Sequence, residues 1–195
     1  MVIIVAGRRI DAEDAEQERF PLKNADSVAE AVRSKFEALR PGVLVCSAAC
    51  GADLIALKMA KALSVRRCII LPFEPSRFRS TSVVDRPGNS TWDWGAIFDD
   101  QIQEVREKDD LLIIPPAADE TASYVATNEH IIAEAERLAS GEGDPSRAPA
   151  SGDQMQCLIV WEGQSRGEDD ITAELISRAR VAGMEVEQIS TLQPS

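Results

Sequence analysis

Two arginines stand directly behind the first apolar run of the chain, where they could bind a phosphate or a carboxylate. The run is Val2–Val5, and the glycine that follows it lets the backbone turn sharply and come close to a ligand. Guanidinium groups offer fixed, forked donors to an anion. The alternative is that both arginines are solvated and pair with acidic side chains of the next loop. The candidates for ligand binding here are Gly7, Arg8, Arg9 and Asp11.

A turn of small residues follows the second apolar run and is a second candidate for ligand contact. Its small side chains leave room for a ligand beside the chain, and free N–H groups at the start of the next helix attract anions. Asp53 either caps that helix or accepts the hydroxyl groups of a ribose. The turn is neither a Walker A loop nor a GxGxxG fingerprint. The candidates here are Ser47, Ala49, Cys50, Gly51 and Asp53.

Five further candidates for ligand binding, Pro72 and Phe73 among them, lie at a strand end or on a helix that faces the same edge of the fold. Phe73 follows Pro72 at the end of the third apolar run, and its ring either stacks on a base or pins the loop to the body. Asn128 stands one helical turn after Tyr124 and presents a polar side chain toward the cleft. The last two candidates for ligand binding, after the fifth apolar run, are Glu162 and Gly163.

The residue types predict no cofactor and no metal. The chain has one histidine, His130, without a second histidine or a cysteine beside it, so neither a metal site nor a histidine triad is expected. The four cysteines fall mostly in apolar runs and at no common zinc spacing, so we expect buried, reduced thiols. Asp169 and Asp170 precede the last helical stretch, where they suit the positive end of the helix as caps or as hydroxyl acceptors.

The alternation of elements predicts a fold in which all these strand ends gather. Six short, mostly continuous apolar runs alternate with five stretches of helical spacing, as expected for strands buried on both faces. The prediction is a three-layer, doubly wound α/β Rossmann-like fold with a mainly parallel six-stranded sheet, which binds ligands at the carboxyl ends of its strands. The expected strand order is 3-2-1-4-5-6, with a flavodoxin-like order as the alternative. Residues 74–94 are expected to form a long loop.

Length and charge narrow the classes of partner. The 195 residues predict a single domain over 1–195, in which 140–153, rich in Gly, Pro, Ser and Asp, form a flexible linker. A net charge of −12 argues against nucleic acid and against an anionic membrane surface as partners. No apolar run reaches the roughly 18 residues of a membrane helix. The apolar start is also too short, and lacks the preceding basic residues, for a signal peptide, so we expect a cytoplasmic protein.

The order of these motifs resembles the SLOG superfamily, the Rossmann-like group named after the Smf/DprA and LONELY GUY proteins, and within it a branch of bacterial signalling domains. The resemblance spans nearly the whole chain outside the linker. The segments that carry it are Gly7-Arg8-Arg9-Ile10-Asp11, Arg19-Phe20-Pro21, Ala49-Cys50-Gly51-Ala52-Asp53, Leu71-Pro72-Phe73, Ser82-Val83, Trp94 with Phe98, Tyr124 with Asn128, and Val160-Trp161-Glu162-Gly163.

The resemblance implies a nucleotide, or a nucleotide-derived second messenger, bound at the strand ends. Relatives commonly pair as dimers, so it also leaves room for a homodimer and for a separate effector protein as partners. Other relatives cleave an N-glycosidic bond in nucleoside monophosphates. This chain departs from them, because Pro115-Pro116-Ala117-Ala118 stands where that branch has a glycine-rich turn. Arg8, Ala52 and Lys58 replace a histidine, a glycine and a glutamate of the group.

Three functions follow from the residues and the resemblance together. The leading hypothesis is a sensor in which the first two segments hold phosphate and ribose and Phe73 faces the base. The first alternative is a nucleoside-type hydrolase or transferase, in which Asp11, Asp53 or Glu129 stabilises an oxocarbenium-like centre. The second alternative is an interaction module whose cleft is vestigial.

Overall fold

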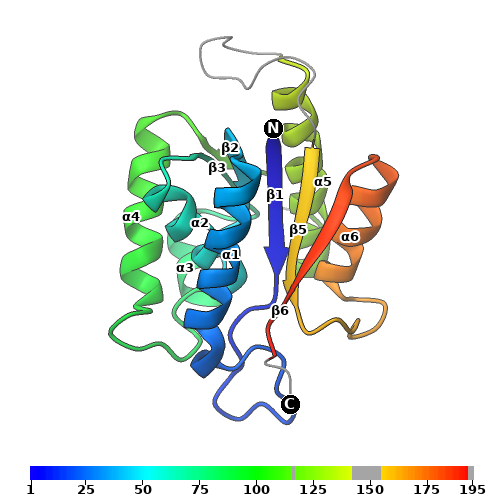
Figure 1. Cartoon of the computed structure of the whole chain (residues 1–195). Helices are drawn as coiled ribbons and strands as arrows, with labels where there is room; N and C mark the ends of the chain where they lie inside the picture. The colour runs from blue at the N-terminus through cyan, green and yellow to red at the C-terminus, as the bar shows by residue number, and fades with distance from the viewer. Residues whose placement is uncertain (116, 142–154, 193–195) are drawn as a thin grey trace.

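A six-stranded parallel sheet runs through the chain and has helices on both of its faces (Figure 1). The computed structural model describes residues 1–115, 117–141 and 155–192. The strands are β1 (Val2–Gly7), β2 (Val43–Cys46), β3 (Arg66–Leu71), β4 (Leu111–Ile113), β5 (Met155–Trp161) and β6 (Glu185–Ser190). The helices are the 3₁₀ turn η1 (Leu22–Asn24), α1 (Ala25–Leu39), α2 (Ala52–Ala62), α3 (Pro75–Ser82), α4 (Trp94–Glu107), α5 (Glu120–Ala139) and α6 (Ile171–Val181).

The strand order is β4-β3-β2-β1-β5-β6, and every pair of neighbouring strands is parallel. The Rossmann-like fold class is therefore confirmed, but the expected order 3-2-1-4-5-6 is wrong, because β4 pairs with β3 at the edge and not with β1. The reason lies in burial. β4 has three residues, and Leu112 is 44% exposed, so this strand suits an edge. β5 has six buried residues and pairs with the full length of β1.

In this strand order, the direction in which successive strands are added to the sheet reverses between β1 and β5. The connections after β1, β2 and β3 run toward one edge of the sheet, whereas those after β4 and β5 run toward the other. The connections that leave β1 and β5 therefore diverge, and open α/β sheets bind ligands in the crevice at such a point. The candidate site is accordingly expected beyond the carboxyl ends of these two strands.

The two faces of the sheet build two apolar cores. Figure 1 shows α1 to α4 on one side of the sheet and α5 and α6 on the other. Successive strand residues point to opposite faces. In β1, Ile3 and Val5 pack with α1, α2 and α4, while Val2 and Ile4 pack with α5 and α6. The continuous apolar run that predicted a doubly covered strand therefore supplies both cores.

The expected long loop at 74–94 contains a helix that sequence periodicity missed. α3 begins at Pro75, which is favourable in a first helical turn, and Phe78 is its one large apolar side chain. One anchor gives no repeating apolar pattern over eight residues. The helix matters because its last turn brings Ser82 to the carboxyl edge of the sheet, where the Ser82 carbonyl accepts a hydrogen bond from Cys50 N–H at 3.0 Å.

The turn after β2 packs against the backbone that leaves β1. Gly51 has φ +92°, and the Ala52 N–H that follows it donates to the Arg8 carbonyl at 3.1 Å. A Cβ on Gly51 would lie 2.6 Å from that same carbonyl oxygen. Glycine is therefore required here both by its backbone conformation and by the close approach of two chain segments.

Two other expectations concern the linker at 140–153 and the absence of a membrane-spanning helix. Of the linker predicted at 140–153, residues 142–153 lie outside the described residues, and α5 ends at Ala139 just before it. Within the described ranges, the helices lack the combination of length and apolar character that crossing a bilayer requires.

We expect Gly51→Ala to lower the free energy of unfolding by at least about 2 kcal/mol more than Gly167→Ala does, as measured by denaturant titration. Gly167 is the matched control, because its φ is +113° but an added Cβ would meet nothing within 4 Å. Equal losses in the two variants would show that the close approach at Gly51 is unimportant.

Candidate functional site

A cleft of about 690 Å³ opens at the carboxyl ends of β1 and β2, between the loop that follows β1, the last turn of α3 and the facing side of α5. This volume lies within the range of small-molecule sites in proteins. Five arginines contribute to its wall although the chain carries a net charge of −12. They are Arg8, Arg9, Arg19, Arg86 and Arg166.

The structure brings part of the predicted site together. The predicted residues in the wall of the cleft are Gly7, Arg8, Arg9, Asp11, Ser47, Ala49, Asp53 and Asn128. The predicted residues that are not part of this wall are Cys50, Gly51, Pro72, Phe73, Glu162 and Gly163. Cys50 and Gly51 shape the turn behind the cleft, and Glu162 acts on it through the arginines that it binds.

The Arg8 guanidinium joins the end of β1 to the segment between β5 and α6. Its Nε donates to Glu162 at 2.6 Å, and its two terminal nitrogens donate to the two Asp170 oxygens, each at 2.8 Å. One terminal nitrogen also donates to the Gln164 carbonyl at 2.6 Å, and the guanidinium lies 5.4 Å from the centre of the Trp161 ring. Arg8 therefore contributes to the cleft mainly as a clamp between strands, with its donors used by the protein.

This clamp is buried and keeps both carboxylates ionised. The side chains of Arg8 and Glu162 are each 3% exposed, and that of Asp170 is fully buried. Burial alone would raise the pKa of Asp170, but its hydrogen bonds with Arg8 and with backbone N–H groups outweigh this and lower the pKa to about 2. The same arginine, with Arg19, lowers the pKa of Glu162 against the effect of burial. Asp170 also caps α6 through Thr172 N–H, which confirms the predicted cap.

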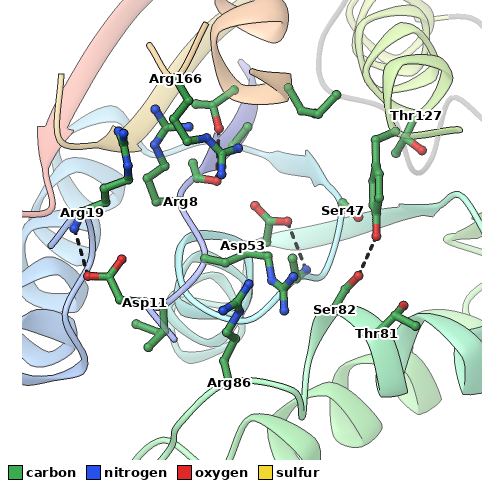
Figure 2. Close-up of a pocket in the computed structure, with 18 of the residues that line it drawn as sticks. Arg8, Asp11, Arg19, Ser47, Asp53, Thr81, Ser82, Arg86, Thr127 and Arg166 are labelled. Carbon is green, nitrogen blue, oxygen red and sulfur yellow. Dashed lines mark hydrogen bonds between the residues drawn. The ribbon is translucent and has the colours of Figure 1, made fainter. Parts of the chain in front are cut away.

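The loop after β1 is closed by Asp11. One of its carboxylate oxygens accepts the backbone N–H groups of Arg19 at 2.9 Å and Phe20 at 3.0 Å. In Figure 2 the first of these bonds joins Asp11 to Arg19 at one side of the cleft. Arg19 in turn pairs with Glu162. Asp11 thus holds the rim of the cleft in place, and its suggested role toward a ligand stays a prediction.

Three buried polar atoms in the wall of the cleft have no hydrogen-bond partner among the described residues. They are Nε of Arg9, Oγ of Ser47 and Nε of Arg86. Arg9 and Arg86 both pair with Asp85, Arg86 loosely at 3.7 Å, but these contacts leave Nε of Arg9 unpaired and give Nε of Arg86 only that long contact. Buried donors without partners cost about 1–3 kcal/mol each, so their gathering in one cavity calls for an explanation.

Asp53 lies in the same part of the cleft, between the arginines (Figure 2). It is 8% exposed and accepts one hydrogen bond, from Ala49 N–H at 3.1 Å. Burial raises its pKa from 3.8 to about 7, although the Ala49 bond and the charge of Arg9 act in the opposite direction. Asp53 is not the cap of α2, because Gly51 holds that position without a side-chain bond. The Asp53 carboxyl group can accept a hydrogen bond from a hydroxyl group or exchange a proton near neutral pH.

Helix α5 forms the opposite wall of the cleft. The Tyr124 hydroxyl and Ser82 Oγ are 2.7 Å apart, so α5 is tied across the cleft to the last turn of α3. Asn128 donates to the Ile171 carbonyl at 2.9 Å and to Glu174 at 2.6 Å, which fixes α5 to α6. Tyr124 and Asn128 therefore hold α5 in position beside the cleft, one against α3 and the other against α6.

Two features of the predicted site have other uses in the structure. Several N–H groups at the start of α2 already have protein acceptors, since Ala52 donates to Arg8 and Leu54 to Ala49. The Phe73 ring is 5% exposed, with Tyr124 at its edge and the Arg77 guanidinium 3.8 Å from its centre. The ring is therefore packed inside the protein. This agrees with the second of the two roles expected from the sequence, in which Phe73 anchors its loop and does not stack on a base.

Sequence reasoning missed the contributions of α3 and of the segment before α6. Thr81 and Arg86 lie in the segment predicted to be a long loop, and Arg166 lies in a polar stretch without any motif. The pKa of Arg166 is lowered by burial and by the charge of Arg8. In the sequence, the one feature that marks Arg86 and Arg166 is their position after a predicted strand. That position does not show which cleft the side chain enters. The described residues contain no cluster of His, Cys, Asp and Glu suited to a metal ion.

Comparison with known proteins gives a distant structural neighbour. The structure of DNA processing protein A (DprA) from Streptococcus pneumoniae is similar over 99% of this chain, with 14% sequence identity and a TM-score of 0.48. The chain spans 50% of the length of that structure. The chain matches no protein-family model, and no curated protein matches its sequence.

We expect Arg8→Met to lower the free energy of unfolding by about 3–5 kcal/mol at pH 7, because it leaves two buried carboxylates without their partner. The loss should shrink as pH falls from about 4 toward 2, where the stabilisation that depends on ionised Asp170 disappears from the wild type as well. Urea titrations across this pH range measure the effect. Arg178→Met is the control, since its pairs with Glu129 and Glu174 are partly exposed and should contribute under about 1 kcal/mol. Equal losses in both variants would contradict the clamp.

For Asp53, the raised pKa means that the folded protein retains a proton which the unfolded chain releases above about pH 4. The free energy of unfolding should therefore fall as pH rises from about 4 to about 7. Asp53→Asn should remove this loss and stabilise the protein by at most about 4 kcal/mol at pH 8. Thermal unfolding of both proteins between pH 3 and pH 8 tests this, and a pH-independent difference between them would refute it.

Proposed function

We propose that the cleft binds an anionic small molecule of the nucleotide type, and that the chain acts as a ligand-binding domain of the sensing kind. The observation that carries the proposal is the set of three unpartnered buried polar atoms, on Arg9, Ser47 and Arg86, in one cavity. A phosphoryl group offers several strong acceptors, and one such group near these atoms would satisfy both guanidinium donors and the hydroxyl.

The charge around the cleft supports an anion. Arg9 and Arg86 share a single ion-pair partner, Asp85, so neither guanidinium has a carboxylate of its own. Asp53, which lies beside it, is held partly neutral near pH 7 by its burial. An acidic protein with a local cationic cavity suits a small anion, because nucleic acid would meet repulsion over the rest of the surface.

A nucleoside fits the remainder of the cleft. Asp53 can accept hydrogen bonds from hydroxyl groups, which suits a ribose. Thr81 and Thr127 add hydroxyl donors and acceptors nearby. Ile10, Ile131 and other aliphatic side chains of the wall offer an apolar surface for a base. The volume of about 690 Å³ accommodates a ligand of this size.

Asp53 also favours a second candidate function, hydrolysis of an N-glycosidic bond in such a ligand. A buried carboxyl with a pKa of about 7 can stabilise a developing positive charge when ionised, or transfer a proton near neutrality. Among the other carboxylates of the described wall, Asp11 is engaged by two backbone N–H groups. Binding without turnover remains the function that the unpartnered donors support best.

The test is isothermal titration calorimetry with nucleoside monophosphates, nucleoside diphosphates, cyclic nucleotides and inorganic phosphate, with chromatography of each mixture for products. We expect Arg86→Ala to weaken nucleotide binding by about 10-fold to 100-fold, as the loss of a charged hydrogen bond predicts. Arg79→Ala is the matched control, since Arg79 pairs with Asp99 outside this cleft and the variant should bind like the wild type.

The outcomes separate the candidate functions. Binding that depends on Arg86 without product supports the sensor, whereas product formation that is lost in Asp53→Asn supports the hydrolase. Absence of binding by every compound in the panel would overturn both and would leave protein interaction as the function to test.

A further inference from the structure

The arginines in the wall of the cleft fall into two groups, which pair with different carboxylates. The first group, Arg9 with Arg86, follows β1 and α3 and faces Asp85. The second group, Arg8, Arg19 and Arg166, faces Glu162 and Asp170. Among these ion-pair partners, two arginines share one carboxylate in the first group and three arginines share two in the second.

The donors that stay available in the second group belong to Arg166. Arg8 uses its guanidinium on two carboxylates and a carbonyl, and Arg19 pairs with Glu162 and with Gln17. In contrast, Nε of Arg166 has only a distant ion pair, 3.8 Å from Asp170, among the described residues. Its lowered pKa, caused by burial and by the neighbouring Arg8 and Arg19, agrees with uncompensated positive charge here.

The outer members of the two groups, Arg86 and Arg166, come from well-separated parts of the sheet. Arg86 follows the helix that leaves β3, and Arg166 follows β5, with β2 and β1 between those strands. Three strand spacings amount to about 14 Å at the sheet. Figure 2 shows Arg86 and Arg166 entering the cleft from opposite sides, with Asp53 between them.

We propose that the cleft takes a ligand with two separate phosphoryl groups on either side of a sugar, the chemistry of a nucleoside bisphosphate. One phosphoryl group lies against Arg9, Ser47 and Arg86, the other against Arg166, and a sugar hydroxyl faces Asp53. The inference rests on the proposed nucleotide-binding function and narrows its ligand class. A diphosphate carries its phosphates next to each other on one side of the sugar, so it fills only one of the two groups.

Calorimetry with adenosine 5′-monophosphate, adenosine diphosphate and adenosine 3′,5′-bisphosphate tests the proposal. The bisphosphate should bind about tenfold or more tightly than the other two. The dinucleotide pApA presents similarly spaced phosphoryl groups within a chain. If pApA binds as tightly as the bisphosphate, the spacing of the two phosphoryl groups is supported and the ligand is the end of a nucleic acid. If pApA binds more weakly than the bisphosphate, the ligand is a free small molecule.

Arg166→Gln and Arg86→Gln separate the two groups. Arg166→Gln should weaken bisphosphate binding about tenfold and change monophosphate binding less than about twofold, while Arg86→Gln should weaken both. Arg79→Gln is the control, and the melting temperature of each variant shows that it is folded.

Two results would overturn the proposal while leaving nucleotide binding intact: diphosphate binding as tight as bisphosphate binding, or an equal effect of Arg166→Gln on mono- and bisphosphate. No binding by any of the compounds would instead overturn the proposed function itself.

Discussion

The candidate cleft depends on the buried ion cluster around Arg8. This arginine stands one residue after β1, and the carboxylates that it binds stand after β5, so the cluster joins the two strands at which the direction of the chain reverses. Without it, the hydrogen bonds of the sheet would hold β1 and β5 side by side but would not fix the segments beyond their ends. A buried charge needs paired charges and hydrogen bonds to be stable, and Arg8 donates four hydrogen bonds to Glu162, Asp170 and the Gln164 carbonyl.

The same cluster determines which charges are left to recognise a ligand. Glu162 and Asp170 neutralise most of the second cationic group and leave Arg166, while Asp85 neutralises only part of the first. The cleft thus gathers five arginines inside an acidic protein, and not all of their donors are used by these carboxylates. Asp53 is buried between these groups, and its raised pKa reduces the repulsion that a full carboxylate would exert on an anion.

Much of the fold could be predicted from the sequence, because continuous apolar runs and helical spacing are local properties. Strand β1 begins at Val2, where its apolar run begins, and the parallel sheet follows from the alternation of elements. The strand order could not be predicted in the same way. It depends on the short, exposed β4 being less suited to the centre than β5, which is a comparison between distant segments.

The site was predicted in part for the same reason. The glycines and arginines after β1 and the turn after β2 lie at strand ends, which the alternation of elements locates. The binding partners of Arg8 are 154 and 162 positions away, so no local pattern indicates that this arginine joins two strand ends. Helix α3 has one apolar anchor, and Arg166 belongs to no pattern, so their contributions to the cleft required the three-dimensional structure.

The central claim is that the unpartnered arginine donors of the cleft receive an anionic ligand. Correlation spectra of the arginine Nε–H groups, recorded by NMR during titration with adenosine 5′-monophosphate, test it most directly. We expect the Nε–H signals of Arg9 and Arg86 to shift and to become protected from exchange with water, while that of Arg79, which already binds Asp99, does not change. Binding of the nucleotide with no change in the signals of Arg9 and Arg86 would contradict the account.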